Sequence, residues 1–486
     1  MRILCLIILF SLFWSCIDNQ NGSTNTTSSK IEFVKPLSSL DSLKERLANL
    51  GRYNALSVAL IRPDTTVIWN FGSADESSLF RVGSVTKSLT GLSILKLVEQ
   101  GKISLNDTLI QLIPELPFSN KFDEPILLKH VLEASAGFVS YRDGDFIIDP
   151  NFDTLSVSEL LVNMPYKFES TWRPGTFTAY HTVGPLISGY VIEDKSNMSY
   201  SDFVETHFFN PLDMPRSTFF VNDDVKKSLV NYQDSTYEYV KARPAAALNT
   251  STSEFTHFLQ MLINNGVYNG KQVLSKESID RFETSTSNLA VNKLEITDGH
   301  GINNWSMYHN GIRYQTHAGE ITPGYLAQYA YSRTYKTAYV FMIQGVSERA
   351  LKVLNNQILP YLHPQIAESP IKKITPEEEN KFIGCYEKVQ KSRITRPAFK
   401  IEIIRDSTGQ LAVLDNNFDN PPHVKPLKPT DKEYIYIDDN PKNNFSINGQ
   451  TRYALVTDEN DQMVIQKLSY PWDAYKRIPC DKNNSH

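Results

Sequence analysis

Runs of apolar residues mark the two ends of a first folded unit. Residues 55–72, ALSVALIRPDTTVIWNFG, contain two such runs joined at Pro63-Asp64, which predicts a β-hairpin. Residues 312–319, 324–333 and 337–345 predict three more strands, and residues 347–362 predict a helix. Residues 105–270 favour helix and loop. Strands therefore open and close this unit, which predicts an α+β domain whose sheet pairs its first and last segments.

A helix is predicted immediately after the first hairpin. Residues 84–100 contain apolar side chains at helical spacing, and Gly101 follows as a helix-terminating C′ residue. The apolar positions that share one face are Val85, Leu89, Leu92, Leu95 and Val98.

The pattern changes after residue 365. Residues 366–376 combine proline with charge and predict a linker between a domain at 31–365 and a second domain at 377–486. In the second domain, short alternating segments such as FKIEII, QLAVLD, EYIYIDD, TRYALV and MVIQKL are separated by turn-forming clusters. This pattern predicts a small antiparallel β domain, similar to a barrel.

Length and charge agree with two globular units. The chain has 486 residues, which is long for one typical domain, and a formal net charge of −5. It contains no basic block, which argues against a nucleic-acid partner.

The first residues have the features of an export signal. Arg2 precedes an apolar run at residues 3–13 that is too short for an ordinary membrane-spanning helix, so residues 1–15 are interpreted as a signal peptide. The run ends at Ser15-Cys16, which resembles the lipobox of bacterial lipoproteins and implies lipidation of Cys16. Residues 16–30 are rich in Asn, Ser and Thr and predict a flexible tether. The alternative is an ordinary secretory signal cut near Cys16.

The four cysteines fit an exported protein without a metal. Cys5 would leave with the signal and Cys16 would carry the lipid, so Cys385 and Cys480 remain as a candidate disulfide. The sequence has no CxxC and no His/Cys metal pattern, and we expect neither a metal nor a cofactor.

A serine three positions before a lysine occurs at Ser84-Lys87, Ser93-Lys96 and Ser369-Lys372. The second pair lies inside the predicted helix, where Lys96 is expected on a solvated face. The third lies in the linker, where nothing would hold it. Ser84 follows Gly83, which permits close approach of another backbone, and begins a helix, where N–H groups are unpaired.

This context suits a nucleophile. Ser84 needs a base to accept its proton, and Lys87, one helical turn later, can serve in its neutral form, which burial favours. The amides at the start of the helix can hold a developing oxyanion. The alternative is a helix-capping serine beside a surface lysine.

Two further segments connect this pair to a known family. Tyr180 lies in RPGTFTAYHTVGPLISGYVIE, and His317 lies in YQTHAGEITPGY. In this order the three segments resemble Ser-x-x-Lys, Tyr-x-Asn and Lys/His-x-Gly of the serine β-lactamase and penicillin-binding-protein superfamily, in its class C-like branch, over about residues 40–362. The resemblance implies an antiparallel sheet flanked by helices, with a helical subdomain. The C-terminal domain resembles the lipocalin-like domain of some members.

The resemblance also implies roles. Ser84 would be the nucleophile, with Lys87 and Tyr180 sharing general-base and general-acid work. His317 would orient the substrate or Tyr180, and the amides of Ser84 and Glu320, after Gly319, would form the oxyanion hole. The alternatives are that Tyr180 is a packing residue and that His317 never contacts a substrate.

Thr182 departs from the pattern because the family has asparagine there, bonding the substrate's amide carbonyl. Threonine offers one hydroxyl instead of an amide. We therefore expect an exported serine hydrolase, periplasmic or at the cell surface, that forms a Ser84 acyl-enzyme. Its substrate would be a small molecule or peptide of the cell envelope, either an ester or a D-amino-acid peptide, with a preference for esters. The alternatives are a DD-peptidase or β-lactamase, and a non-catalytic envelope-anchored binding protein.

The predicted lipid anchor can be tested by cell fractionation. The unaltered protein should sediment with membranes, and Cys16→Ala should release it, because stable anchoring requires the acyl chains of a lipidated terminus. A soluble unaltered protein would exclude the anchor.

Overall fold

The computed structural model describes most of the folded chain. The described residues are 31–50, 53–138, 147–148, 155–162, 168–233, 237–240, 242–345, 349–367, 369–389, 399–415, 423–438, 450–469 and 473–480. The expected signal peptide, Cys16 and the tether at 16–30 lie outside them. No helix within the described ranges is long and apolar enough to cross a membrane.

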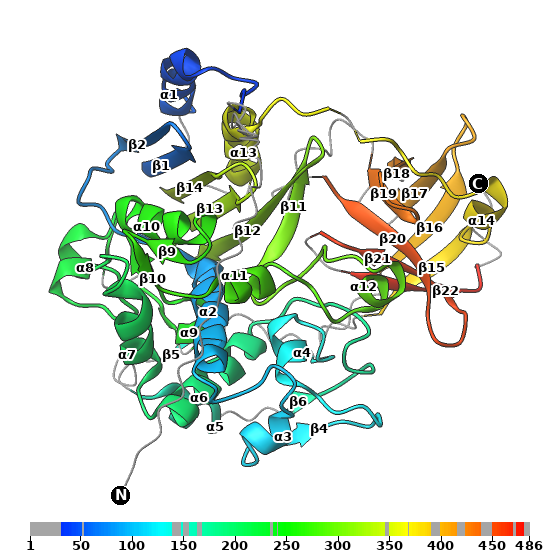
Figure 1. Cartoon of the computed structure of the whole chain (residues 1–486), viewed down its shortest axis with the longest axis horizontal. Coiled ribbons are helices and arrows are strands. Elements are labelled where there is room, and N and C mark those ends of the chain that lie inside the picture. The colour runs from blue at the N-terminus through cyan, green and yellow to red at the C-terminus, as the bar shows by residue number, and fades with distance from the viewer. Residues whose placement is uncertain are drawn as a thin grey trace, which may run out of the picture.

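A six-stranded antiparallel sheet organises the first domain (Figure 1). Its order is β11-β12-β13-β14-β1-β2. The late strand β14 (Thr337–Gln344) pairs with the early strand β1 (Ala55–Arg62), as expected for a sheet that joins the two ends of the domain. The other strands are β2 (Thr65–Gly72), β11 (Trp305–His309), β12 (Ile312–Ile321) and β13 (Tyr325–Ser332).

Helices cover both faces of this sheet. On one face, α1 (Leu40–Ala48) and α13 (Arg349–Leu362) pack on Leu56, Val58 and their neighbours. On the other, α2 (Thr86–Glu99) and α10 (Thr252–Ile263) belong to the larger core cluster. Gly101 follows Gln100, the C-cap of α2, and has a positive φ of 67°, as a C′ residue should.

A helical subdomain extends from the face that carries α2. Its helices are α3 (Leu109–Leu112), α4 (Leu128–Leu132), α5 (Val157–Val162), α6 (Val183–Ser196), α7 (Tyr200–Val204), α8 (Asp223–Ser228) and α9 (Arg243–Ala246), and α11 (Lys276–Phe282) and α12 (Leu289–Leu294) follow α10. Strands in this region are only two residues long: β3 (Phe80–Arg81) pairs with β8 (Asn249–Thr250), β4 (Phe118–Ser119) with β6 (Phe168–Glu169), β5 (Ile147–Ile148) with β7 (Tyr239–Val240), and β9 (Val267–Tyr268) with β10 (Lys271–Gln272).

The second domain is a closed eight-stranded antiparallel barrel. A short helix, α14 (Pro376–Asn380), precedes it. The strands are β15 (Gly384–Lys388), β16 (Lys400–Arg405), β17 (Leu411–Asp415), β18 (His423–Pro429), β19 (Ile435–Asp438), β20 (Arg452–Thr457), β21 (Met463–Lys467) and β22 (Ala474–Ile478). Five of them coincide with the predicted segments. The sequence pattern did not predict β15, β18 or β22.

The first and last strands of the barrel close it. β15 pairs with β22, and Cys385 lies opposite Ile478 in that pairing. Cys480, two residues later, forms a disulfide with Cys385, with 5.2 Å between their Cα atoms. The covalent bond therefore joins the two ends of the barrel sequence at the seam where its sheet closes.

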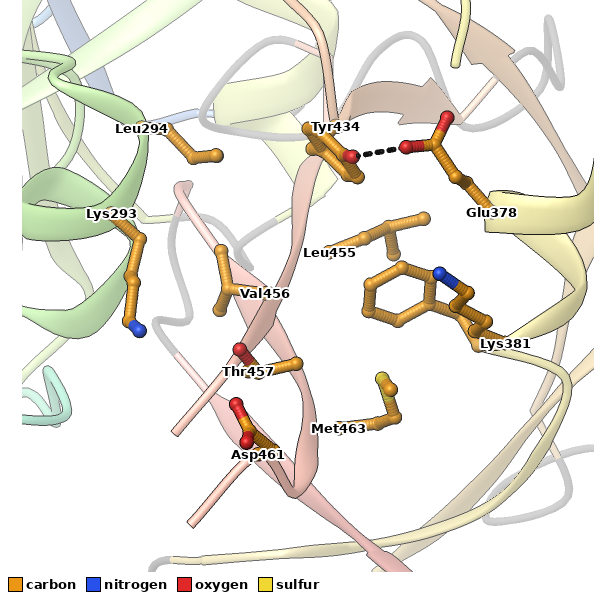
Figure 2. Close-up of a pocket in the computed structure, with 11 residues that line it drawn as sticks. Lys293, Leu294, Glu378, Lys381, Tyr434, Leu455, Val456, Thr457, Asp461 and Met463 are labelled. Carbon is orange, nitrogen blue, oxygen red and sulfur yellow. Dashed lines mark hydrogen bonds between the residues drawn. The ribbon is translucent and has the colours of Figure 1, made fainter. Parts of the chain in front are cut away.

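The barrel packs against the first domain through a shared apolar cluster. Trp172, Phe177 and Leu289 of the first domain meet Val456 and Val464 of the barrel. A cavity of about 360 Å³ lies beside this contact, between α12 and the barrel. Figure 2 shows Lys293 and Leu294 on one side of it and Lys381 and Met463 on the other.

The disulfide should carry much of the barrel's stability. The bond joins residues 95 positions apart, and restricting so long a loop in the unfolded chain contributes about 4–5 kcal/mol in the chain-entropy description. A Cys385→Ser/Cys480→Ser double variant should therefore lower the free energy of unfolding in urea by up to this amount. Reducing the unaltered protein should have the same effect. Two free thiols in peptide maps of protein exported to an oxidising compartment would contradict the pairing.

Candidate active site

Ser84 and Lys87 meet in the interior of the first domain. Gly83–Val85 form a 3-10 turn that leads into α2, so Ser84 lies just before the α-helix. Lys87 Nζ is 2.7 Å from Ser84 Oγ and 3.0 Å from the carbonyl oxygen of Ala245 on α9. Only 2% of Lys87 is exposed, whereas Ser84 is half-buried. The structure thus contradicts the alternative of a capping serine beside a surface lysine.

Two glycines let strand β12 approach the Ser84 turn. A Cβ atom on Gly319 would lie 2.1 Å from the carbonyl oxygen of Val82 and 2.6 Å from Ser84 N. A Cβ atom on Gly83, whose φ is +50°, would lie 2.9 Å from Glu320 N. All three distances are shorter than real Cβ contacts, so only glycine fits at either place. The backbones of Ser84 and Glu320, the two expected oxyanion donors, are therefore neighbours.

Tyr180 reaches the pair from the loop before α6. Its half-buried ring has its centroid 5.1 Å from Lys87 Nζ. Thr182 is the N-cap residue of α6, but its side chain accepts no hydrogen bond from the backbone N–H groups of the first turn. Instead, His181 Nδ1 accepts a hydrogen bond from Gly184 N at 3.0 Å. His181 thus fixes the start of α6 and, with it, the loop that presents Tyr180 and Thr182.

His317 lies behind Tyr180, fully buried. Its ring centroid is 6.2 Å from that of Tyr180 and 4.2 Å from that of Trp305. Nδ1 is 2.7 Å from the carbonyl oxygen of Ala318. In this conformation the imidazole offers no exposed atom to a ligand. It contacts the aromatic residues around Tyr180, which favours an orienting role over direct substrate contact.

His300 and Trp305 complete an aromatic wall around Tyr180 that sequence reasoning missed. The ring centroids of His300 and Trp305 are 6.3 and 6.4 Å from that of Tyr180. Burial lowers the pKa of His300 to about 4, and burial also holds the pKa of His317 well below its usual value. Both rings are therefore neutral at pH 7. Residues 298–305 have no helical or strand periodicity, and only their density of His, Asn and Trp could have drawn attention to them.

The other two Ser-Lys pairs are not brought to this site. Ser93 donates to the carbonyl oxygen of Leu89 within α2. The expectation of a solvated Lys96 was wrong, because its side chain is 23% exposed and donates to the carbonyl oxygen of Val273 at 2.9 Å. Lys372, in the expected linker, donates its backbone N–H to Thr430 of the barrel.

The cavity between α12 and the barrel does not contain any of these residues. Its lining comes from α12, α14, β20, β21 and the turns beside them, so it is separate from the Ser84 site. No cluster of three His, Cys, Asp or Glu side chains suited to a metal ion occurs among the residues that the structure describes.

A central helix with Ser-x-x-Lys at its start, on an antiparallel sheet with helices on both faces, defines a serine β-lactamase or penicillin-binding-protein fold. The sequence profile of the Beta-lactamase family matches residues 42–361. The chain belongs to this family. The barrel lies beyond the matched region.

Curated relatives match part of the chain. Protein flp of Staphylococcus aureus strain MW2 is 27% identical over 202 residues, which are 39% of this chain and 40% of the relative. Penicillin-binding protein 4* of Bacillus subtilis is 26% identical over 185 residues, 36% of this chain and 40% of the relative. The matches thus span about two fifths of each relative.

Solved structures share the fold at lower identity. The octameric penicillin-binding protein homologue from Pyrococcus abyssi is 18% identical with a TM-score of 0.54, and the match covers 91% of this chain and 100% of that one. The β-lactamase/D-alanine carboxypeptidase from Yersinia pestis is 16% identical with a TM-score of 0.56, and the match covers 67% of this chain and 97% of that one. The match to the Pyrococcus abyssi protein is long enough to include part of the barrel. The match to the Yersinia pestis protein is about as long as the first domain alone.

Neutral buried histidines should make the fold sensitive to acid. The unfolded chain binds protons at histidine below about pH 6.5, whereas burial lowers the folded-state pKa of His300 to about 4 and of His181 to about 3. The unfolded state then holds more protons, so stability falls as pH decreases from about 6.5 toward 4. Each such group contributes up to about 1.4 kcal/mol per pH unit.

Urea unfolding at pH 7.5 and pH 5 measures this loss. His300→Gln should flatten the dependence relative to the unaltered protein, because one group that titrates only in the unfolded chain has been removed. Equal stability at both pH values would contradict this prediction, because the folded and unfolded chains would then bind the same number of protons.

Proposed function

We propose that this protein is a serine hydrolase that forms an acyl-enzyme at Ser84 and prefers esters. The observation that carries the proposal is the 2.7 Å separation between Ser84 Oγ and the buried Nζ of Lys87. A hydroxyl becomes a useful nucleophile only when a base is positioned to accept its proton, and a lysine out of contact with water can serve as that base.

The proposed first step is attack of Ser84 Oγ on the substrate's carbonyl carbon as neutral Lys87 takes the hydroxyl proton. The carbonyl oxygen gains negative charge, and the adjacent amides of Ser84 and Glu320 are suited to stabilise it. Collapse of this intermediate breaks the bond to the leaving group, which Tyr180 protonates, with Lys87 resupplying the proton. Water then attacks the acyl-enzyme by the same route and regenerates Ser84.

Thr182 supports the ester preference. Two residues after Tyr180, it stands where the family motif has asparagine, and its half-buried side chain ends in a hydroxyl rather than an amide. An amide substrate would lose a hydrogen bond to its carbonyl at this position, whereas an activated ester depends less on such positioning. The names of the relatives, penicillin-binding protein and D-alanine carboxypeptidase, favour instead a DD-peptidase or β-lactamase.

We further propose that the protein acts outside the cytoplasm, held by a lipid on Cys16. Support comes from the apolar run before Cys16 and from the Cys385–Cys480 disulfide, a bond typical of oxidising compartments. Its substrate would then come from the cell envelope.

Ser84→Ala should abolish turnover of p-nitrophenyl acetate and remove the acyl adduct from intact-mass spectra. Lys87→Ala and Tyr180→Phe should each lower the rate by about 10²–10⁴, the usual effect of losing acid–base assistance. Ser93→Ala is the matched control, because it makes the same change in a Ser-x-x-Lys pair of the same helix and should leave the rate unchanged. Full esterase activity in Ser84→Ala would contradict the mechanism.

In the same assays, Thr182→Asn should raise turnover of penicillin or D-Ala-D-Ala peptides relative to the ester, because asparagine restores an amide contact. Efficient β-lactam turnover by the unaltered protein would reject the ester preference while leaving the Ser84 mechanism in place. Absence of any adduct with esters and penicillins would favour the non-catalytic binding protein.

A further inference from the structure

The barrel contacts the first domain on one side of the candidate site. The apolar cluster that it shares includes Phe177 and Ala179, immediately before Tyr180, and Leu289–Val291 of α12. Lys476 of β22 lies 5.3 Å from the centre of the Phe177 ring. The residues around Ser84 and Lys87 belong to a different cluster, which contains only residues of the first domain. Among the described residues, the barrel therefore shares apolar contacts with the segment before Tyr180, and the apolar cluster around Ser84 and Lys87 contains none of its side chains.

A buried ion pair crosses this boundary. Arg452, the first residue of β20, has Nη2 3.3 Å from Asp298 Oδ2, and the two residues are 5% and 2% exposed. The guanidinium carbon lies 3.8 Å from the centre of the Tyr308 ring, and Tyr308 Oη donates to Asp298 Oδ1 at 2.7 Å. Arg313 adds a more distant charge at 3.7 Å. The 3.3 Å contact between Arg452 and Asp298 is charge attraction rather than an aligned hydrogen bond.

The positive charge of Arg452 stabilises the buried Asp298 carboxylate. Burial alone would raise the pKa of Asp298, but Arg452 first, then Arg313 and Tyr308, lower it below its usual value. Removing one partner of such a buried pair leaves an uncompensated charge, which is strongly unfavourable. Asp298 would then move toward water and take its loop with it.

That loop carries the wall behind Tyr180. Asp298 is followed by Gly299, whose carbonyl accepts a hydrogen bond from Ser306 N at 2.9 Å. Between these ends, His300 and Trp305 are joined by an isolated β-bridge. A shift of Asp298 is therefore transmitted directly to the two aromatic residues that pack near Tyr180. On the barrel side, Gln450 N donates to the carbonyl oxygen of Tyr308 at 2.8 Å, which anchors the same strand.

We propose that Arg452 is a positioning residue of the active site: through Asp298 it makes the barrel hold the His300–Trp305 loop against Tyr180. The barrel is then a required part of the hydrolase rather than an independent appendage. The kinetic part of this inference rests on the proposed hydrolase function, and the structural part does not.

The test compares Arg452→Met with Arg405→Met. Arg405 also forms a barrel ion pair, with Glu379 at 2.6 Å, but that pair lies wholly within the C-terminal part of the chain, between β16 and α14. Hydrogen exchange by mass spectrometry should show faster exchange in peptides covering 176–182 and 297–306 of Arg452→Met, with 83–90 unchanged. Arg405→Met should change none of the three.

Ester turnover supplies the second readout. In Arg452→Met, kcat should fall about 10-fold with KM nearly unchanged, because small displacements of catalytic groups are costly even when substrate still binds. Arg452→Lys should recover most of the loss by keeping the charge. Asp298→Asn should resemble Arg452→Met, and the double variant should be no worse than either, as expected for partners in one interaction.

Unchanged exchange in 297–306 in both Arg452→Met and Asp298→Asn would overturn the proposal, and so would equal effects of Arg452→Met and Arg405→Met. If Arg452→Met does not fold, Asp298→Asn breaks the same ion pair from the first domain and carries the same comparison with Arg405→Met. If the unaltered protein hydrolyses no ester, the proposed function fails, while the exchange experiment still decides whether Arg452 positions the loop.

Discussion

The amino group of Lys87 is buried, and the rest of the site is arranged around that fact. Taking a lysine out of water is costly unless polar partners replace the lost hydration. Here the replacements are the hydroxyl oxygen of Ser84 and the carbonyl oxygen of Ala245. Both come from neighbouring backbone turns, so α2 and α9 must pack closely for Lys87 to be satisfied. The same packing keeps water away from the Lys87 amino group and points that amino group at the Ser84 hydroxyl.

Close backbone approach is the second requirement. The strand that carries His317 could not border the Ser84 turn if either Gly83 or Gly319 had a side chain. The two glycines therefore let strand β12 contact the Ser84 turn through its backbone. The side chain of Lys87 connects the same turn to α9 through its hydrogen bonds. Strands β13 and β14 are buried throughout and α2 is buried over most of its length, so packing fixes the elements next to the site.

The sequence predicted what depends on local pattern. The paired first and last strands, the helix that ends before Gly101, and five barrel strands all have apolar periodicity that can be read directly. The prediction failed where pattern and structure diverge. β18 reads HVKPLKP, and its two prolines argue against a strand even though they are tolerated in this ladder. Lys96 looked like a surface residue because its partner, the Val273 carbonyl, lies far along the chain.

The same distinction applies to the site. Ser84, Lys87, Tyr180 and His317 could be found because each lies in a motif with a recognisable neighbourhood. His300 and Trp305 could not, because their role depends on where a loop without periodicity folds. Arg452 was still harder to predict, since it belongs to another domain and meets Asp298 only in three dimensions.

The shared apolar cluster has a consequence for the order in which the protein matures. The ribosome makes the first domain before the barrel, so Trp172, Phe177 and Leu289 lack their barrel partners until the last hundred or so residues emerge. During that interval the nascent chain exposes hydrophobic surface, which chaperones bind and from which aggregation can begin. A chain truncated before the barrel would keep that surface indefinitely, so quality control would have reason to remove it.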